Sequence, residues 1–253
     1  MSTSIGYTNL VKTGTVTVTS EASGFEKENA QSYKTSTWWK ASAAGTVYFT
    51  IDMGSAVTVD SWGIIGHNLF DNSGTIKAQY SSDNFAADTN DLDTVQTPSA
   101  NIAIFRKATS RSARYYRFEI ASTGSASFIG NFFLGAALDL PNGMTSGFSP
   151  ASLNRDRDIF NNMTQGGNYT GRILRSKGSE VSISQRNVTR AWVDSNWAAL
   201  ADHIELYPFY FAWDTTNFPA DAAYCMAQKI NYPSYSDNTY MRFNIDCVAI
   251  YDV

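Results

Sequence analysis

The first 140 residues consist of short runs of β-branched and aromatic residues, separated by clusters of turn residues. Valine alternates with threonine over residues 15–19. Later runs of the same character occupy residues 46–52, 57–65, 75–80, 102–106, 114–120 and 127–134. Turn residues such as Met53-Gly54-Ser55 and Ser122-Thr123-Gly124 lie between them. Short strands at this spacing predict an antiparallel β-sandwich.

The charge of the chain argues against a nucleic-acid partner. Charged residues make up only 17% of the chain, the net charge is −4, and the isoelectric point is about 5.2. Phosphate backbones are bound by clustered Lys and Arg side chains. The nearest such cluster is Arg106, Lys107, Arg111, Arg114 and Arg117. We interpret it as a solvated strand face rather than a site for a polyanion.

Compartment and redox state are suggested by the N-terminus and by the two cysteines. The first residues, MSTSIGYTNL, lack the basic start and apolar run of a signal peptide. No stretch approaches the roughly 20 apolar residues that span a bilayer, so we expect a cytoplasmic product without membrane insertion. Cys225 and Cys247 do not form a disulfide framework. A single disulfide between them remains an alternative, but buried free thiols are the favoured interpretation.

A Pro- and Gly-rich stretch at residues 140–150 marks a boundary, which predicts domains at residues 1–140 and 141–253. The second domain is expected to be α+β. A hairpin is predicted over residues 169–185 with Lys177-Gly178 as its turn, and further strands over residues 209–213 and 240–251. Apolar residues recur at helical spacing over residues 189–204, with Asn187 or Thr189 as the N-cap.

The order of motifs in the first domain resembles the discoidin, or galactose-binding-like, β-sandwich. The resemblance rests on Trp38-Trp39, on Gly66-His67-Asn68 at a strand end, and on the strand at residues 113–120. It implies binding to surfaces or sugars rather than catalysis. The candidate ligand-binding residues are Trp38, Trp39, His67 and Asn68. Aromatic rings stack on a pyranose, and Asn and His bond its hydroxyls. The competing and favoured interpretation is that one tryptophan plugs the sandwich and that the polar residues close a turn.

The second domain resembles the ring-forming domain of phage distal tail proteins. The resemblance rests on residues 155–161, Gln165-Gly166-Gly167, a helix with Trp197, and the PFYF strand at residues 208–211. It implies a structural virion protein of a siphophage tail tip or baseplate, made in the host cytoplasm. Six copies would form a ring around the tail tube, contact other tail proteins, and present the sandwich to fibres or host surface glycans. The alternative function is a stand-alone carbohydrate-binding module.

Motifs for catalysis and metal binding are absent from the sequence. There is no G-x-S-x-G, H-E-x-x-H or paired C-x-x-C. His203 lies near the end of the predicted helix, where a structural role is expected. The acidic stretch with Asp83, Asp88, Asp91 and Asp93 lacks the glycine and final glutamate of an EF-hand. We therefore predict no enzyme activity, no cofactor and no metal site, with a hydrolase of unrecognised acids as the third alternative.

Overall fold

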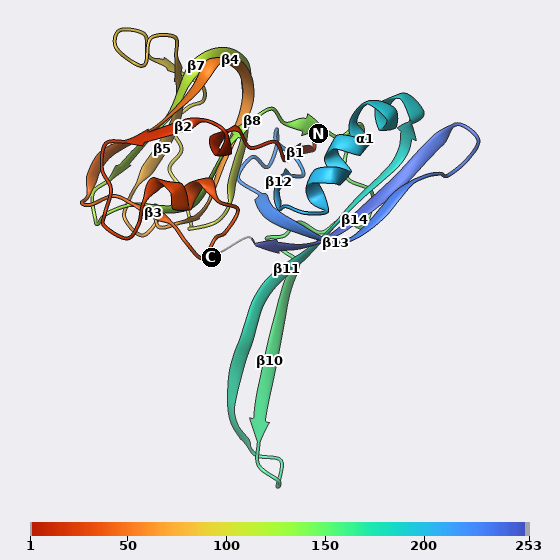
Figure 1. Cartoon of the computed structure of the whole chain (residues 1–253). Coiled ribbons are helices and arrows are strands. Elements are labelled where there is room, and N and C mark those ends of the chain that lie inside the picture. Colours follow the sequence, from red (N-terminus) through yellow and green to blue (C-terminus); the bar gives the residue numbers. More distant parts are fainter. Residues whose placement is uncertain (1, 251–253) are drawn as a thin grey trace.

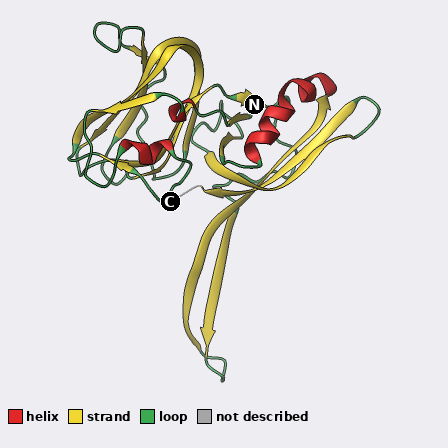
Figure 2. Cartoon of the chain, viewed as in Figure 1, coloured by secondary structure: helices red, strands yellow, loops and turns green. Residues whose placement is uncertain are grey.

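The structure is a computed structural model that describes residues 2–250, without the side chains of residues 155–157 and 175–177. The described chain is mainly β-strand (Figure 2). Its one α-helix is α1 (Arg190–Ile204). Its strands form two antiparallel sheets. The prediction of a mainly β fold with an N-terminal β-sandwich is confirmed. No helix in the described part of the chain is long and apolar enough to cross a membrane.

The β-sandwich is made by one sheet that folds over on itself (Figure 1). Its strands are β2 (Thr15–Val18), β3 (Trp39–Lys40), β4 (Gly45–His67), β5 (Thr75–Ser81), β6 (Asn90–Asp91), β7 (Ile104–Ser122) and β8 (Phe128–Gly135), with short 3-10 helices η1 (Leu10–Lys12) and η2 (Lys27–Gln31). The strands predicted at residues 46–52 and 57–65 are parts of one continuous strand, β4. Those predicted at residues 102–106 and 114–120 are likewise joined in β7. Their register shifts between Asp52 and Val57, where Gly54 has a φ of 74°. That left-handed residue lets β4 pass from one layer to the other.

The core of the sandwich lies between these two layers. Val47, Phe49 and Ile51 alternate inward from the first half of β4, and Trp62 and Ile64 come from its second half. The rings of Phe49 and Phe132 lie 4.2 Å apart between their centroids. This period-2 alternation is the pattern from which the strands were predicted.

The second sheet has the order β10-β11-β14-β13-β12-β1-β9. Its strands are β1 (Ser4–Gly6), β9 (Leu138–Asp139), β10 (Arg155–Met163), β11 (Tyr169–Thr189), β12 (Phe209–Ala212), β13 (Ala222–Tyr235) and β14 (Tyr240–Ile250). The predicted hairpin within residues 169–185 is wrong, because β11 runs straight through Gly178. The turn lies instead at residues 164–168, where Gly167 has a φ of 83°.

Helix α1 covers one face of the second sheet, as predicted. Thr189 is the N-cap, and its side chain accepts a hydrogen bond from the Trp192 N–H. The buried stripe of the helix contains Trp197, Leu200, Ala201 and Ile204. It packs on inward residues of β11 and β14, including Ile183 and Phe243. Cys225 and Cys247 are free and buried in the same core.

The two sheets meet through a third apolar cluster. Ile65, Phe105 and Phe133 face outward from the sandwich and contact Tyr210 and Tyr224 of the second sheet. The Tyr210 hydroxyl donates to Asn131 Oδ1 over 2.9 Å, and the Tyr224 hydroxyl donates to the Tyr33 carbonyl over 3.0 Å. Strands β1 and β9, from the first 140 residues, also pair within the second sheet. Independent folding of residues 1–140 and 141–253 stays a prediction.

Residues 155–178 form a two-stranded arm, hereafter the arm, that projects from the body of the molecule (Figure 1). Pairing between β11 and β14 begins only at Ser179, which lies opposite Ala249. Before that point β10 and β11 have only each other as strand partners in the described chain.

Replacing Trp197 with alanine is expected to destabilise the fold strongly. The side chain is 7% exposed, and its ring centroid lies 4.6 Å from that of Phe243. Its Nε1 has no hydrogen-bond partner among the described residues, so the loss is one of apolar packing. Trp197→Ala should lower the free energy of unfolding by about 3–5 kcal/mol. Urea titration provides the measurement. Trp192→Ala, a half-buried control on the same helix, should cost less, and a loss under about 1 kcal/mol for Trp197→Ala would contradict the assignment.

Candidate functional site

Trp39, one of the predicted ligand-binding residues, is part of the sandwich core. Its side chain is fully buried and its ring packs against Phe49 and Phe132, with centroids 5.7 and 6.2 Å away. Its Nε1 donates to the Ser20 carbonyl over 3.2 Å. Such a ring fills the interior of the sandwich and is not available for stacking on a sugar.

His67 and Asn68 close the connection that follows β4. Asn68 Nδ2 donates to the Ala126 carbonyl over 3.1 Å, and its Oδ1 accepts the Phe128 N–H over 2.9 Å. His67 Nε2 lies 2.8 Å from the Ile102 carbonyl, and its Nδ1 accepts the Leu69 N–H over 3.3 Å. These contacts require the neutral tautomer with the proton on Nε2. Both side chains are buried and their polar atoms are engaged within the protein.

Trp38 is the predicted residue that remains at the surface. It is half-buried, and its ring lies between Phe25 and Phe128, with centroid distances of 6.0 and 5.3 Å. Lys40 Nζ lies 5.6 Å from the centroid of the Phe25 ring. We call Phe25, Trp38 and Phe128 the rim aromatic cluster. No sequence motif marks Phe25 or Phe128 as site residues, and only the strand alternation around residue 128 offered a signal for either. Ligand binding at the predicted residues therefore depends on Trp38 and stays a prediction.

The acidic stretch between β5 and β7 uses its carboxylates to hold the local backbone. Asp83 accepts the N–H groups of Ala86, Ala87 and Asp88 at 3.1, 2.9 and 3.0 Å. The hydrogen bond from the Ser81 hydroxyl, followed by these backbone donors, lowers the pKa of Asp83. Asp93 Oδ2 accepts from Trp62 Nε1 and Arg106 Nε, both over 3.2 Å. Within residues 2–250 no group of three or more metal-binding side chains comes together.

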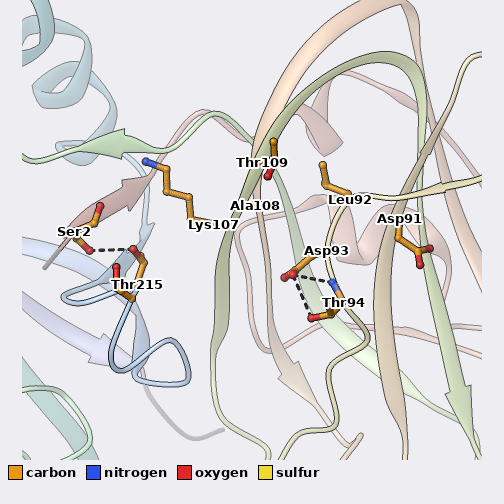
Figure 3. Close-up of a pocket in the computed structure, with 10 residues that line it drawn as sticks. Ser2, Asp91, Leu92, Asp93, Thr94, Lys107, Ala108, Thr109 and Thr215 are labelled. Carbon is orange, nitrogen blue, oxygen red and sulfur yellow. Dashed lines mark hydrogen bonds between the residues drawn. The ribbon is translucent and has the colours of Figure 1, made fainter.

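A polar cleft of about 690 Å³ lies where the sandwich meets the second sheet (Figure 3). Asp93, Thr94 and Lys107 line it from the sandwich side, and Ser2 and Thr215 from the other. The Thr215 N–H and hydroxyl donate to the Ser2 carbonyl over 2.9 and 3.1 Å. The charged side chains Lys107 and Asp93 of the cleft are already in ion pairs, with Asp139 and Arg106 respectively. The cleft offers hydroxyl groups and charges that are already paired, and within it Thr94 Oγ1 donates to Asp93 Oδ1 over 3.4 Å.

Comparison with known proteins gives structural likeness without sequence relatives. No protein-family model matches the chain, and no curated protein matches its sequence. The solved structures that it resembles include carbohydrate-binding modules with a galactose-binding-like fold. A chitosan-binding module of a chitosanase/glucanase from Paenibacillus sp. IK-5 shares 22% identity, with a TM-score of 0.43, over 50% of this chain and 98% of that one. A module from Clostridium perfringens in complex with GalNAc-β-1,3-galactose shares 16% identity, with a TM-score of 0.43, over 51% of this chain and 100% of that one. A pectin-binding module shares 15% identity, with a TM-score of 0.40, over 50% and 93% of the two chains.

Acidification is expected to destabilise the fold through His67. Burial lowers the pKa of His67 from 6.5 to about 4. Between these values the unfolded chain binds the proton and the folded chain does not. The free energy of unfolding should therefore fall as the pH drops from 6.5 to 4, by about 3 kcal/mol in total. Urea titrations at several pH values measure this decline. His67→Gln should make it shallower, whereas an unchanged decline would assign the pH dependence to other groups.

Proposed function

We propose that this chain is a structural subunit that assembles with copies of itself. The observation that carries the proposal is the arm. Its apolar side chains are exposed to solvent along its length, among them Ile159, Met163, Tyr169, Ile173 and Leu174. Met163 is 62% exposed and Tyr169 is 65% exposed, near the tip. Apolar surface of this extent is typical of a contact region for another protein.

The geometry of the arm favours a partner that covers both of its faces. A lone two-stranded hairpin is marginally stable in water. Ile173 and Leu174 are successive strand residues, so their side chains leave opposite faces of the arm. One flat partner surface would cover only one of them. In a closed ring, an arm inserted between neighbouring subunits is covered on both sides. The outer edge of β10 is also open to strand pairing in the described chain.

The finer proposal is a ring of six copies in a siphophage tail tip. It is supported by the order of segments in the second domain, namely the hairpin, the helix with Trp197 and the PFYF strand. In this arrangement the second sheet and the arm join neighbouring copies around the tail tube. The sandwich then points away from the ring and contacts fibres, other tail proteins or host surface glycans. The chain's contribution is assembly and attachment, without a chemical step.

Charged residues on the arm are expected to prevent self-association. Ile173→Asp and Leu174→Asp place a carboxylate on either face of the arm, where both native side chains are exposed in the single chain. Each variant should fold normally and should weaken self-association at least tenfold, because an unpaired charge must be desolvated at the contact. Sedimentation velocity over a range of concentrations measures this. Leu206→Asp, at a 74% exposed position on the body, is the matched control.

Two results would contradict the proposed assembly. One is a wild-type protein that stays monomeric at high concentration by sedimentation and by native mass spectrometry. The other is equal self-association of the wild type and the two arm variants, which would place the contact elsewhere on the molecule.

The second candidate function is carbohydrate binding by the sandwich, as a stand-alone module or within the ring. The rim aromatic cluster favours it, because Trp38 presents a partly exposed ring beside two further aromatic rings. Aromatic platforms of this kind stack on the apolar face of a sugar. A single shallow site of this type gives affinities on the order of millimolar. Six copies on one ring would raise the overall affinity without new contacts.

Removal of the Trp38 ring is expected to abolish any glycan binding at the rim. Host surface glycans are titrated onto the wild type and Trp38→Ala while tryptophan fluorescence is followed. A saturable wild-type response with a Kd of about a millimolar, absent in Trp38→Ala, is the expected result. Trp192→Ala controls for the loss of one fluorophore. Identical responses from wild type and Trp38→Ala, or none from either, would leave the rim aromatic cluster with a packing role only.

A further inference from the structure

The outer face of one sandwich layer is not covered by the second sheet. This layer contains β2, the first half of β4, the second half of β7, and β5. The opposite layer packs against the second sheet through Ile65, Phe105 and Phe133. On the uncovered layer, Arg117 of β7 lies in register with Thr50 of β4 and Gln79 of β5. Its side chain is half-buried.

The guanidinium of Arg117 is held between two aromatic rings. Its Cζ lies 4.4 Å from the centroid of the Tyr48 ring and 4.0 Å from that of the Phe85 ring. Tyr48 comes from β4 and Phe85 from the loop after β5, and these strands flank β7 on opposite sides. Such contacts fix the plane of a guanidinium and reduce its freedom before any ligand arrives.

A buried glutamine fixes the remaining orientation of Arg117. Gln79 is 3% exposed, and its Oε1 accepts from Arg117 Nε over 2.7 Å. Its Nε2 donates to Asp91 Oδ1 over 2.9 Å, which sets which end of the amide faces the arginine. Asp91 is paired with Lys77 at 3.2 Å, and Arg117 attracts the same carboxylate at longer range. Arg117 itself has no carboxylate within ion-pair distance in the described chain, which leaves its Nη edge available to an anion.

The loop that supplies Phe85 is held in an unfavourable conformation. Asn84 and Phe85 have φ values of 60° and 61°, the left-handed region that bulky side chains such as phenylalanine avoid. Asp83 holds the loop by accepting three backbone N–H groups, and the Phe85 N–H donates to Ser81 Oγ over 2.9 Å. Asparagine adopts this region readily, so the strain lies at Phe85; a strained residue of this kind persists only where its surroundings impose the conformation, and such strain is concentrated at ligand sites. Here the strain places the Phe85 ring on Arg117.

We propose that Arg117, between Tyr48 and Phe85, binds the carboxylate of an acidic sugar. The Nη edge of a guanidinium binds a carboxylate through two parallel hydrogen bonds. With the Tyr48 and Phe85 rings 4.4 and 4.0 Å from Cζ and with Nε bonded to Gln79, the Nη groups are the donors left for a ligand carboxylate. The neighbouring hydroxyl groups of Tyr48 and Thr50 match the hydroxyl groups of a sugar. This site lies apart from the rim aromatic cluster and does not depend on self-assembly.

The test compares D-glucuronate with D-glucose. The two sugars differ only at C6, where glucuronate carries a carboxylate and glucose a hydroxymethyl group. Backbone amide shifts around Phe85 are followed by NMR during each titration. Glucuronate should bind the wild type with a Kd of about a millimolar, and glucose should give no saturable shift. Arg117→Lys keeps the positive charge but cannot form the bidentate pair of hydrogen bonds, so the affinity for glucuronate should weaken at least tenfold. Arg114→Gln is the control, because Arg114 is already paired with Asp52 at 2.8 Å and stacks on Tyr115.

A second variant separates ligand binding from a purely structural role. Phe85→Gly removes the ring and accommodates the positive φ, so the melting temperature should change little while glucuronate binding is lost. Equal binding of glucose and glucuronate, or unchanged binding by Arg117→Lys, would overturn the proposal. Inorganic phosphate or acetate binding as tightly as glucuronate would overturn the assignment to an acidic sugar. The sugar titrations do not test self-association, so this proposal and the proposed assembly can fail separately.

Discussion

The contact between the sandwich and the second sheet is the constraint on which the rest of the molecule depends. It requires the end of β4 to be buried on both faces, with Trp62 and Ile64 in the sandwich core and Ile65 against the second sheet. A close approach of the sheets is needed at Gly63, where an added Cβ would lie 2.7 Å from the Ile104 carbonyl and 3.1 Å from the Tyr210 ring. The absence of a side chain at this position thus allows Tyr210 to reach Asn131. Once this contact forms, one sandwich layer is hidden and the opposite layer, with Arg117, is left facing solvent.

Much of the fold could be predicted from local pattern, and the exceptions have physical reasons. Helix α1 was predicted with its cap, because Trp197, Leu200 and Ile204 repeat at helical spacing after Thr189. The segment around Cys225 was interpreted as strand-like, but the extent of β13 was not predicted, because its second half mixes polar residues and Pro233 without alternation. The hairpin turn was misplaced, because Lys177-Gly178 has the composition of a turn but lies opposite Arg157 and Asp156 in a continuous ladder. Pairing with a distant strand overrides such local signals.

The candidate sites were harder to predict than the strands. Trp38 and Trp39 are adjacent, and neighbouring strand residues point to opposite faces, so the sequence alone cannot assign which ring is buried. The structure buries Trp39 and leaves Trp38 with Phe25 and Phe128. The surroundings of Arg117 had no sequence signature at all. They depend on three strands in register and on a left-handed conformation at Phe85. A phenylalanine in the sequence gives no indication of such a conformation.

The insertion of β1 between β12 and β9 links the beginning of the chain to its end. The Thr3 hydroxyl donates to the Trp213 carbonyl, which is 210 residues away in sequence. During synthesis on a ribosome, the first strand therefore emerges long before its partner β12 exists. Contacts between such distant residues close large loops and slow the final folding step. The sandwich strands are nearer in sequence and can pair earlier, so the nascent protein holds a nearly finished sandwich in which β1 can pair with β9 but has a free edge where β12 will add. That strand is the segment most exposed to mispairing with another nascent chain until the last third of the protein is made.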